Sequence, residues 1–104
     1  MVDYTTRIII SLKDIEKLRS SVVSPNAEQI KRYGNAVAAK TERIAAMIEI
    51  LANSGFSLSM KKEYIYADSE NIEAVAAKRL LADKGFEDKE YQIYLEYRRQ
   101  WGVM

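Results

Sequence analysis

The stretch that decides the fold is SPNAEQIKRYGNAVAAKTERIAAMIEILAN, residues 24–53. Serine followed by proline is typical of a helix start, because serine caps free amides and proline loses no hydrogen bond at the first helical position. Apolar residues then recur at spacings of three and four, which places them on one side of a helix. They are Ile30, Tyr33, Val37, Ile44, Met47, Ile48 and Leu51. The stretch predicts one long helix over about 25–53.

The length of this helix raises a question about how it is covered. At 1.5 Å per residue it would be about 43 Å long, whereas a compact domain of this size has a diameter of about 33 Å. Either the helix bends at Gly34, or part of the Ile30–Leu51 stripe packs against a second copy of the chain. Alanines beside the stripe would let another helix approach closely. They are Ala36, Ala38, Ala39, Ala45 and Ala46.

Shorter elements are expected on both sides of the long helix. Residues 4–10 are rich in β-branched types and predict a strand or an extended arm. The sequence SLKD at 11–14 has the form of a capping box and predicts a helix over 12–22. Alternating apolar residues predict a strand or hairpin over 57–66, for which 5–10 is the candidate pairing partner. Acidic residues at 68–70 predict the start of a further helix, 69–84.

Two helix ends carry the same signature, Leu-Ala-x-x-Gly-Phe, at residues 51–56 and 81–86. In a Schellman stop the glycine takes a left-handed conformation and the next residue packs back on the helix. The pattern therefore predicts contacts of Phe56 with Leu51 and of Phe86 with Leu81.

Residues 88–101 fit two structures. Apolar and aromatic residues alternate as in a strand, yet acids stand at the beginning and arginines at the end, as a helix dipole favours. We therefore predict a helix over 88–101. The expected fold is a mainly α, four-helix small domain that covers residues 1–104, with residues 1–10 as a candidate extended arm. The alternative is a two-layer α+β sandwich with 90–98 as a third strand.

Composition excludes several classes of function. The 104 residues include neither cysteine nor histidine, which excludes thiolate chemistry, zinc–histidine sites and serine–histidine catalysis. We expect no enzyme activity, no cofactor and no metal site. The beginning of the sequence lacks the features of a signal peptide and no apolar run could span a membrane, so we expect a cytoplasmic protein without a membrane partner.

The leading functional prediction is a small protein–protein interaction or assembly module that self-associates as a homodimer or larger oligomer. Two surfaces are candidates: the stripe of the long helix and an aromatic face at the C-terminal end. The first comprises Ile30, Tyr33, Val37 and Ile44, and the second Tyr91, Tyr94, Tyr97 and Trp101. The competing interpretation of both sets is ordinary core packing.

The alternative prediction is a nucleic-acid-binding accessory domain. Basic residues occur in pairs, and two pairs brought together beside aromatic rings could bind phosphates and stack on bases. The pairs are Lys31–Arg32, Lys61–Lys62 and Arg98–Arg99. Nearby acids and a net charge of +1 favour a charge-balanced, solvated surface instead.

Overall fold

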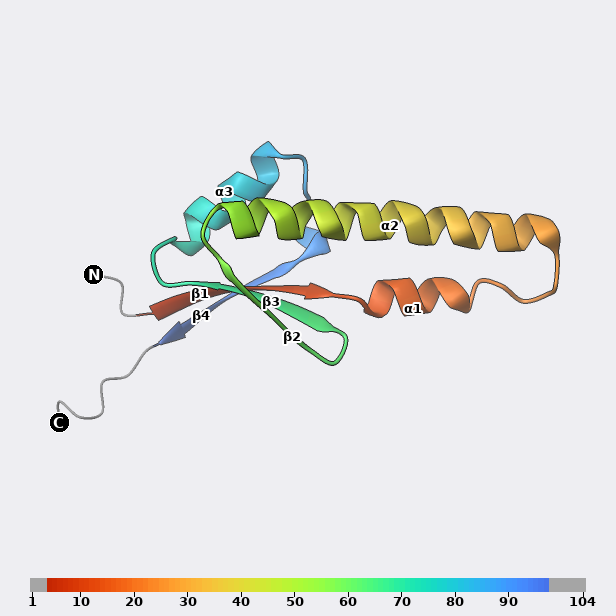
Figure 1. Ribbon diagram of the computed structural model, residues 1–104, viewed down its shortest axis with the longest axis horizontal. Coiled ribbons are helices and arrows are strands. Elements are labelled where there is room, and N and C mark those ends of the chain that lie inside the picture. The colour runs from red at the N-terminus through yellow and green to blue at the C-terminus, as the bar shows by residue number, and fades with distance from the viewer. Residues whose placement is uncertain (1–3, 98–104) are drawn as a thin grey trace.

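The computed structural model describes residues 4–97, and within that range the chain forms an α+β fold (Figure 1). Three α-helices accompany a four-stranded antiparallel sheet, so the predicted mainly α four-helix domain is wrong. The elements are β1 Tyr4–Ser11, α1 Lys13–Arg19, α2 Ala27–Asn53, β2 Ser57–Lys61, β3 Tyr64–Ser69, α3 Ala74–Asp83, a 3₁₀ turn at Asp88–Glu90 and β4 Gln92–Tyr97.

The strands lie in the order β2-β3-β1-β4. β1 is central: Ile8 pairs with Ala67 of β3 on one side and with Ile93 of β4 on the other. Residues 4–10 are therefore no free arm, and the expected pairing of 5–10 with the 57–66 region is made through β3. The connectivity is that of the split β-α-β arrangement, with the pair α1–α2 in place of its first helix.

The predicted helix over 88–101 is wrong for the described residues, because 92–97 form strand β4. The acids that suggested a helix start serve a single 3₁₀ turn, in which Glu87 and Glu90 form a capping box. The alternating apolar and aromatic residues do form a strand, because β1 offers an edge with which this strand can pair. The α+β alternative is closer to the observed fold, although the sheet has four strands and not three.

The core lies between one face of the sheet and the helices α2 and α3. Ile8 and Ile10 of β1 point into it and meet Met47 and Leu51 of α2 and Leu81 of α3. Both predicted Schellman stops are confirmed: Gly55 and Gly85 have φ of 98° and 89°. Phe56 and Phe86 donate backbone hydrogen bonds of 3.0 Å to the carbonyls of Leu51 and Leu81, and all four side chains are buried in the core.

The predicted helix boundaries need correction, at the N-terminal ends of α2 and α3 and mainly at the C-terminal end of α1. α2 begins at Ala27 because the Asn26 side chain accepts hydrogen bonds from the amides of Glu28 and Gln29, and so replaces the expected Ser24–Pro25 cap. α1 is shorter than predicted, 13–19 and not 12–22. α3 begins at Ala74 because Ser69 ends β3, where its side chain accepts hydrogen bonds from the next loop.

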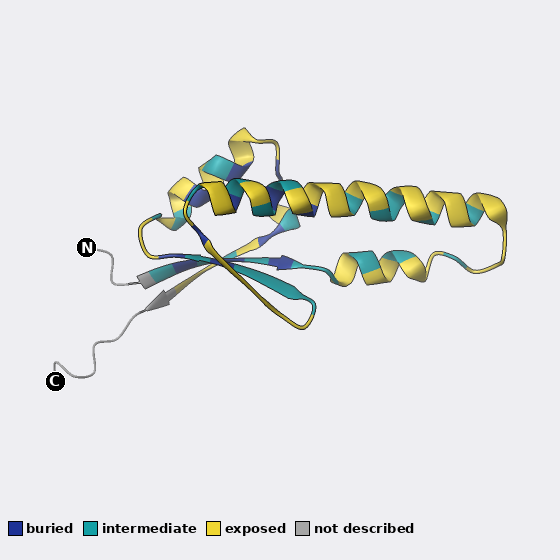
Figure 2. Ribbon diagram, viewed as in Figure 1, coloured by how far each residue is buried: buried dark blue, intermediate teal, exposed yellow. Residues whose placement is uncertain are grey.

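α2 runs without a break through Gly34, so a bend there, one of the two alternatives, is absent (Figure 1). Its C-terminal part covers the sheet, while its N-terminal part projects beyond the sheet beside α1. We call α1 together with residues 27–43 of α2 the helical arm. No residue in either segment of this arm is fully buried (Figure 2). The molecule measures 63 × 29 × 18 Å with a radius of gyration of 17.1 Å, whereas a compact domain of this size has about 13 Å.

Candidate functional site

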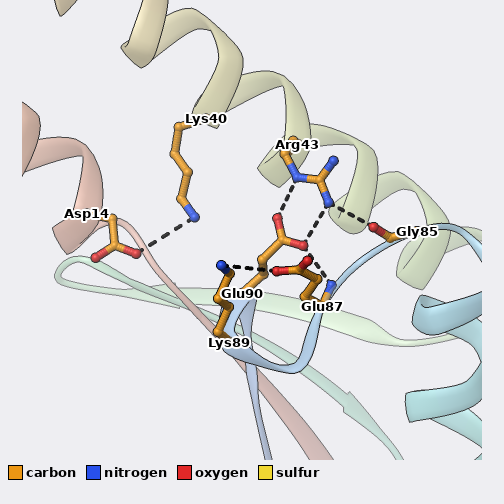
Figure 3. Close-up of a pocket in the computed structure, with 7 residues that line it drawn as sticks. All are labelled: Asp14, Lys40, Arg43, Gly85, Glu87, Lys89 and Glu90. Atoms are coloured by element: carbon orange, nitrogen blue, oxygen red, sulfur yellow. Dashed lines mark hydrogen bonds and ion pairs between the residues drawn. The ribbon is translucent and has the colours of Figure 1, made fainter.

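A cleft lies between the helical arm and the loop that joins α3 to β4 (Figure 3). It is lined by charged side chains from both elements, and each cation is paired. Lys40 lies 3.7 Å from Asp14, and Lys89 lies 3.2 Å from Glu87. Arg43 donates from Nη2 to Glu90 Oε2 at 2.7 Å and to the carbonyl of Gly85 at 3.0 Å, and its Nε donates to Oε1 of the same carboxylate.

Glu90 is the most perturbed titratable group of this cleft. Its side chain is only 9% exposed. Hydrogen bonding from Arg43, supported by the Glu87 amide, lowers its pKa from 4.5 to about 2 against the opposing effect of burial. Hydrogen bonding to Glu90 correspondingly raises the pKa of Arg43. The pair holds the arm-bearing helix against the α3–β4 loop, which gives it a structural role.

Glu90 is not a suitable general acid or base at neutral pH. A general acid or base needs a pKa near the working pH. The carboxyl of Glu90, by contrast, stays ionised even at pH values far below neutrality. Within residues 4–97 no group of three acidic side chains is placed to hold a metal ion. Among the helices of that same range, none is long and apolar enough to cross a membrane.

The face of the sheet away from the helices is the second candidate surface. Arg7 of β1 lies over the ring of Tyr66, 4.7 Å from its centroid, and donates two hydrogen bonds to Asp68, at 2.8 and 3.0 Å. A nucleobase could stack on Tyr66 there only by displacing this guanidinium. The face therefore carries aromatic rings, but its central cation is already neutralised.

The basic pairs predicted for nucleic-acid binding do not come together in the described structure. Lys31 and Arg32 lie near the tip of the helical arm, where Arg32 pairs with Glu28 at 2.8 Å. Lys61 and Lys62 lie at the β2–β3 turn, on the sheet (Figure 1). Arg98 and Arg99 lie outside the described residues.

The residues of the predicted aromatic face do not share one surface. Tyr91 is buried in the core, and burial raises the pKa of its hydroxyl. Tyr94 is half exposed, and its register partner Arg7 places it on the open face. The backbone of Tyr97 lies on β4, and Trp101 lies outside the described residues. The prediction that these four residues share one helical face is therefore wrong for residues 91–97.

The predicted stripe of α2 is divided between two environments. Ile44 is in the core, whereas Tyr33 and Val37 are half-buried on the helical arm and Ile30 is 51% exposed. The side of α2 that carries this stripe is therefore mostly covered by the same chain. A neighbouring side of the same helix is not covered.

This uncovered side bears no charge over the whole helix. At about 100° per residue, the nine residues on it fall within a sector of roughly 100°. We call it the uncharged face; it comprises Ala27, Ile30, Gly34, Val37, Ala38, Thr41, Ala45, Ile48 and Ala52. All are exposed except Val37 and Ile48, which are half-buried. Thr41 bonds its hydroxyl to the carbonyls of Val37 and Ala38, so it presents no unsatisfied polar group.

The uncharged face looks toward the β2 edge of the sheet. Arg43 reaches the α3–β4 loop from one side of α2, and Thr41 and Ala45 project from the opposite side, about 200° away around the helix. Leu58 and Met60 of β2 pair with Ala67 and Ile65, which point toward the helices. They are nevertheless 41% and 62% exposed. The layer of helices over the sheet is therefore incomplete above β2.

Sequence reasoning named three members of the uncharged face, Ile30, Val37 and Ile48, and noted two of its alanines, Ala38 and Ala45. It did not find Gly34, Thr41, Leu58 or Met60 as parts of one surface. A helical projection would have shown the sector without charge, but its exposure depends on where the sheet and α1 lie.

Comparison with known proteins gives no further identification: no protein family, curated protein or solved structure matches this chain.

Proposed function

We propose that this protein is a non-enzymatic assembly module that associates with a second copy of itself through the uncharged face of α2. The observation that carries the proposal is a helix of 27 residues, about 40 Å long, with a continuous uncharged side that its own chain leaves largely exposed. Small residues on that side permit close packing of another helix.

The shape of the molecule supports the proposal. A radius of gyration of 17.1 Å leaves more surface in water than a chain of this size needs. The helical arm projects beyond the sheet and has no fully buried residue. Exposed apolar area of this kind favours a partner with a matching apolar surface, and an identical helix provides one.

The first prediction concerns Ala45→Arg, in the middle of the uncharged face. The new side chain would lie beside Glu42 and Glu49, three and four positions away, so the helix itself should tolerate it. Its bulk would prevent close packing, and we expect association to weaken by about 2 kcal/mol or more, roughly thirtyfold in Kd. Sedimentation equilibrium over a concentration series measures this change.

Ala39→Arg is the matched control, because Ala39 is exposed on the other flank of the same helix. It should leave the Kd unchanged. If the wild-type chain stays monomeric at the highest concentration, the proposed function is wrong. Equal Kd values for the two variants would place the contact elsewhere on the molecule.

The nucleic-acid alternative receives less support. The two basic pairs that the structure describes lie apart, and the cation at the centre of the open sheet face is bound to Asp68. It predicts affinity for mixed single-stranded DNA or RNA that falls steeply with salt. A cytoplasmic location stays an expectation, since a chain without cysteine suits a reducing compartment.

A further inference from the structure

We infer that the two copies pair with their α2 helices antiparallel, so that Gly34 of one copy lies opposite Ala45 of the other. This inference rests on the proposed function and specifies its geometry. In this register the small residues of the uncharged face oppose one another along the seam. Ala38 then faces Thr41, and Ala27 faces Ala52.

Charge complementarity selects this direction. Lys31 lies beside the seam near one end of α2 and Glu49 lies on the same flank near the other end. Both are exposed, and within residues 4–97 neither has an ion-pair partner. In an antiparallel pair equivalent flanks meet, so each Lys31 approaches Glu49 of the second copy. In a parallel pair opposite flanks meet, so Lys31 and Glu49 would have no such partner across the seam.

The size of the contact also favours this direction. A seam about 40 Å long and 10 Å wide covers about 400 Å² per copy, which is half of the roughly 800 Å² per partner in a standard interface. The antiparallel pair adds further area, because the projecting arm of each copy then runs beside the sheet of the other. Leu58 and Met60, the apolar residues that α2 leaves uncovered on β2, lie on that side. In a parallel pair the two arms would project together, away from both sheets.

The native chain has no cysteine, so introduced cysteines report on the direction of pairing. We expect Gly34→Cys mixed with a tagged Ala45→Cys chain to give mainly the tagged–untagged disulfide dimer on mild oxidation. Gly34→Cys alone should give almost none, since two Gly34 residues would be about 16 Å apart along the antiparallel seam. A disulfide needs Cα atoms within about 7 Å. Non-reducing gel electrophoresis with peptide mapping identifies the linked residues.

Ala39→Cys mixed with the same tagged Ala45→Cys chain is the control, because Ala39 lies on the other flank of α2. This mixture should form no more disulfide than thiols on non-associating molecules do at the same concentration. Efficient self-linking of Gly34→Cys would show a parallel pair and overturn the inference while the self-association stands. Absence of all cross-links from a wild-type chain that sediments as a dimer would also overturn it. A monomeric wild type would instead reject the proposed function itself.

Discussion

Leu51→Ala should lower the free energy of unfolding by about 2–5 kcal/mol, the usual range for removing a fully buried leucine. Leu51 has no exposed surface. Its carbonyl also accepts a hydrogen bond from the backbone N–H of Phe56, which caps the C-terminal end of α2. The lost side chain would leave a cavity between α2 and the sheet. Urea unfolding followed by circular dichroism, at a concentration where the chain is monomeric, measures the change.

Ile30→Ala on the helical arm is the matched control, since Ile30 belongs to the same helix and is 51% exposed. Its effect should stay within about 0.5 kcal/mol in the monomer, as for most surface substitutions. Equal losses for the two variants would contradict the division of α2 into a covered part and a projecting part.

The second large effect is expected for Glu90→Gln at neutral pH. The variant leaves Arg43 without its carboxylate partner in the cleft, and we expect a loss of about 1–3 kcal/mol. The lower part of this range is favoured because solvent screens the guanidinium, which is 47% exposed. Thermal or urea unfolding of both proteins at several pH values gives the difference.

The pH dependence of that difference follows from the direction of the shift. The folded protein lowers the pKa of Glu90 from 4.5 to about 2, so the carboxylate stabilises the fold at any pH above 4.5. This stabilisation is lost as the pH falls through that interval. The difference between wild type and Glu90→Gln should therefore be constant near neutrality and shrink from pH 4.5 to 2. A difference that grows on acidification would contradict the assigned ion pair.

Glu28→Gln provides the comparison for an exposed carboxylate. Glu28 pairs with Arg32 on the surface of the same helix, where both side chains are largely in water. Its substitution should change stability by less than about 0.5 kcal/mol at any pH in the series.

Local signals in the sequence predicted the features that depend on a few neighbouring residues. The Schellman stops at Gly55 and Gly85 and the C-terminal end of α2 at Asn53 follow from such signals. The β-branched run at 4–10 also gave the correct extended conformation. These features need no knowledge of what lies across the fold.

The predictions were wrong where contacts with residues far away in the sequence determine the local structure. Residues 92–97 are a strand because β1, more than 80 positions earlier, offers its edge. The acids before this strand mimic a helix start, but one of them is the partner of Arg43 on α2. The sequence also could not show that α2 stays straight, since a glycine without close neighbours permits both a bend and a regular helix.

The same limit applies to the candidate surface. The apolar stripe Ile30–Leu51 is easy to recognise, but α2 uses most of it within its own chain. The surface that remains exposed is less apolar and consists largely of alanine, glycine and threonine. Its position beside the uncovered side of β2 depends on the order of the strands, which no local pattern encodes.

The central position of β1 has a consequence for synthesis of the chain. The strand Tyr4–Ser11 leaves the ribosome before β3 and β4, the two strands with which it pairs. Until β3 and β4 have emerged, Ile8 and Ile9 lack one or both of their neighbouring strands, and Ile10 lacks its partner on β3 until β3 is made. A β-branched apolar run in this state is prone to intermolecular strand pairing. The nascent chain therefore passes through an interval in which α2 can already form while the apolar strand β1 has no pairing partner.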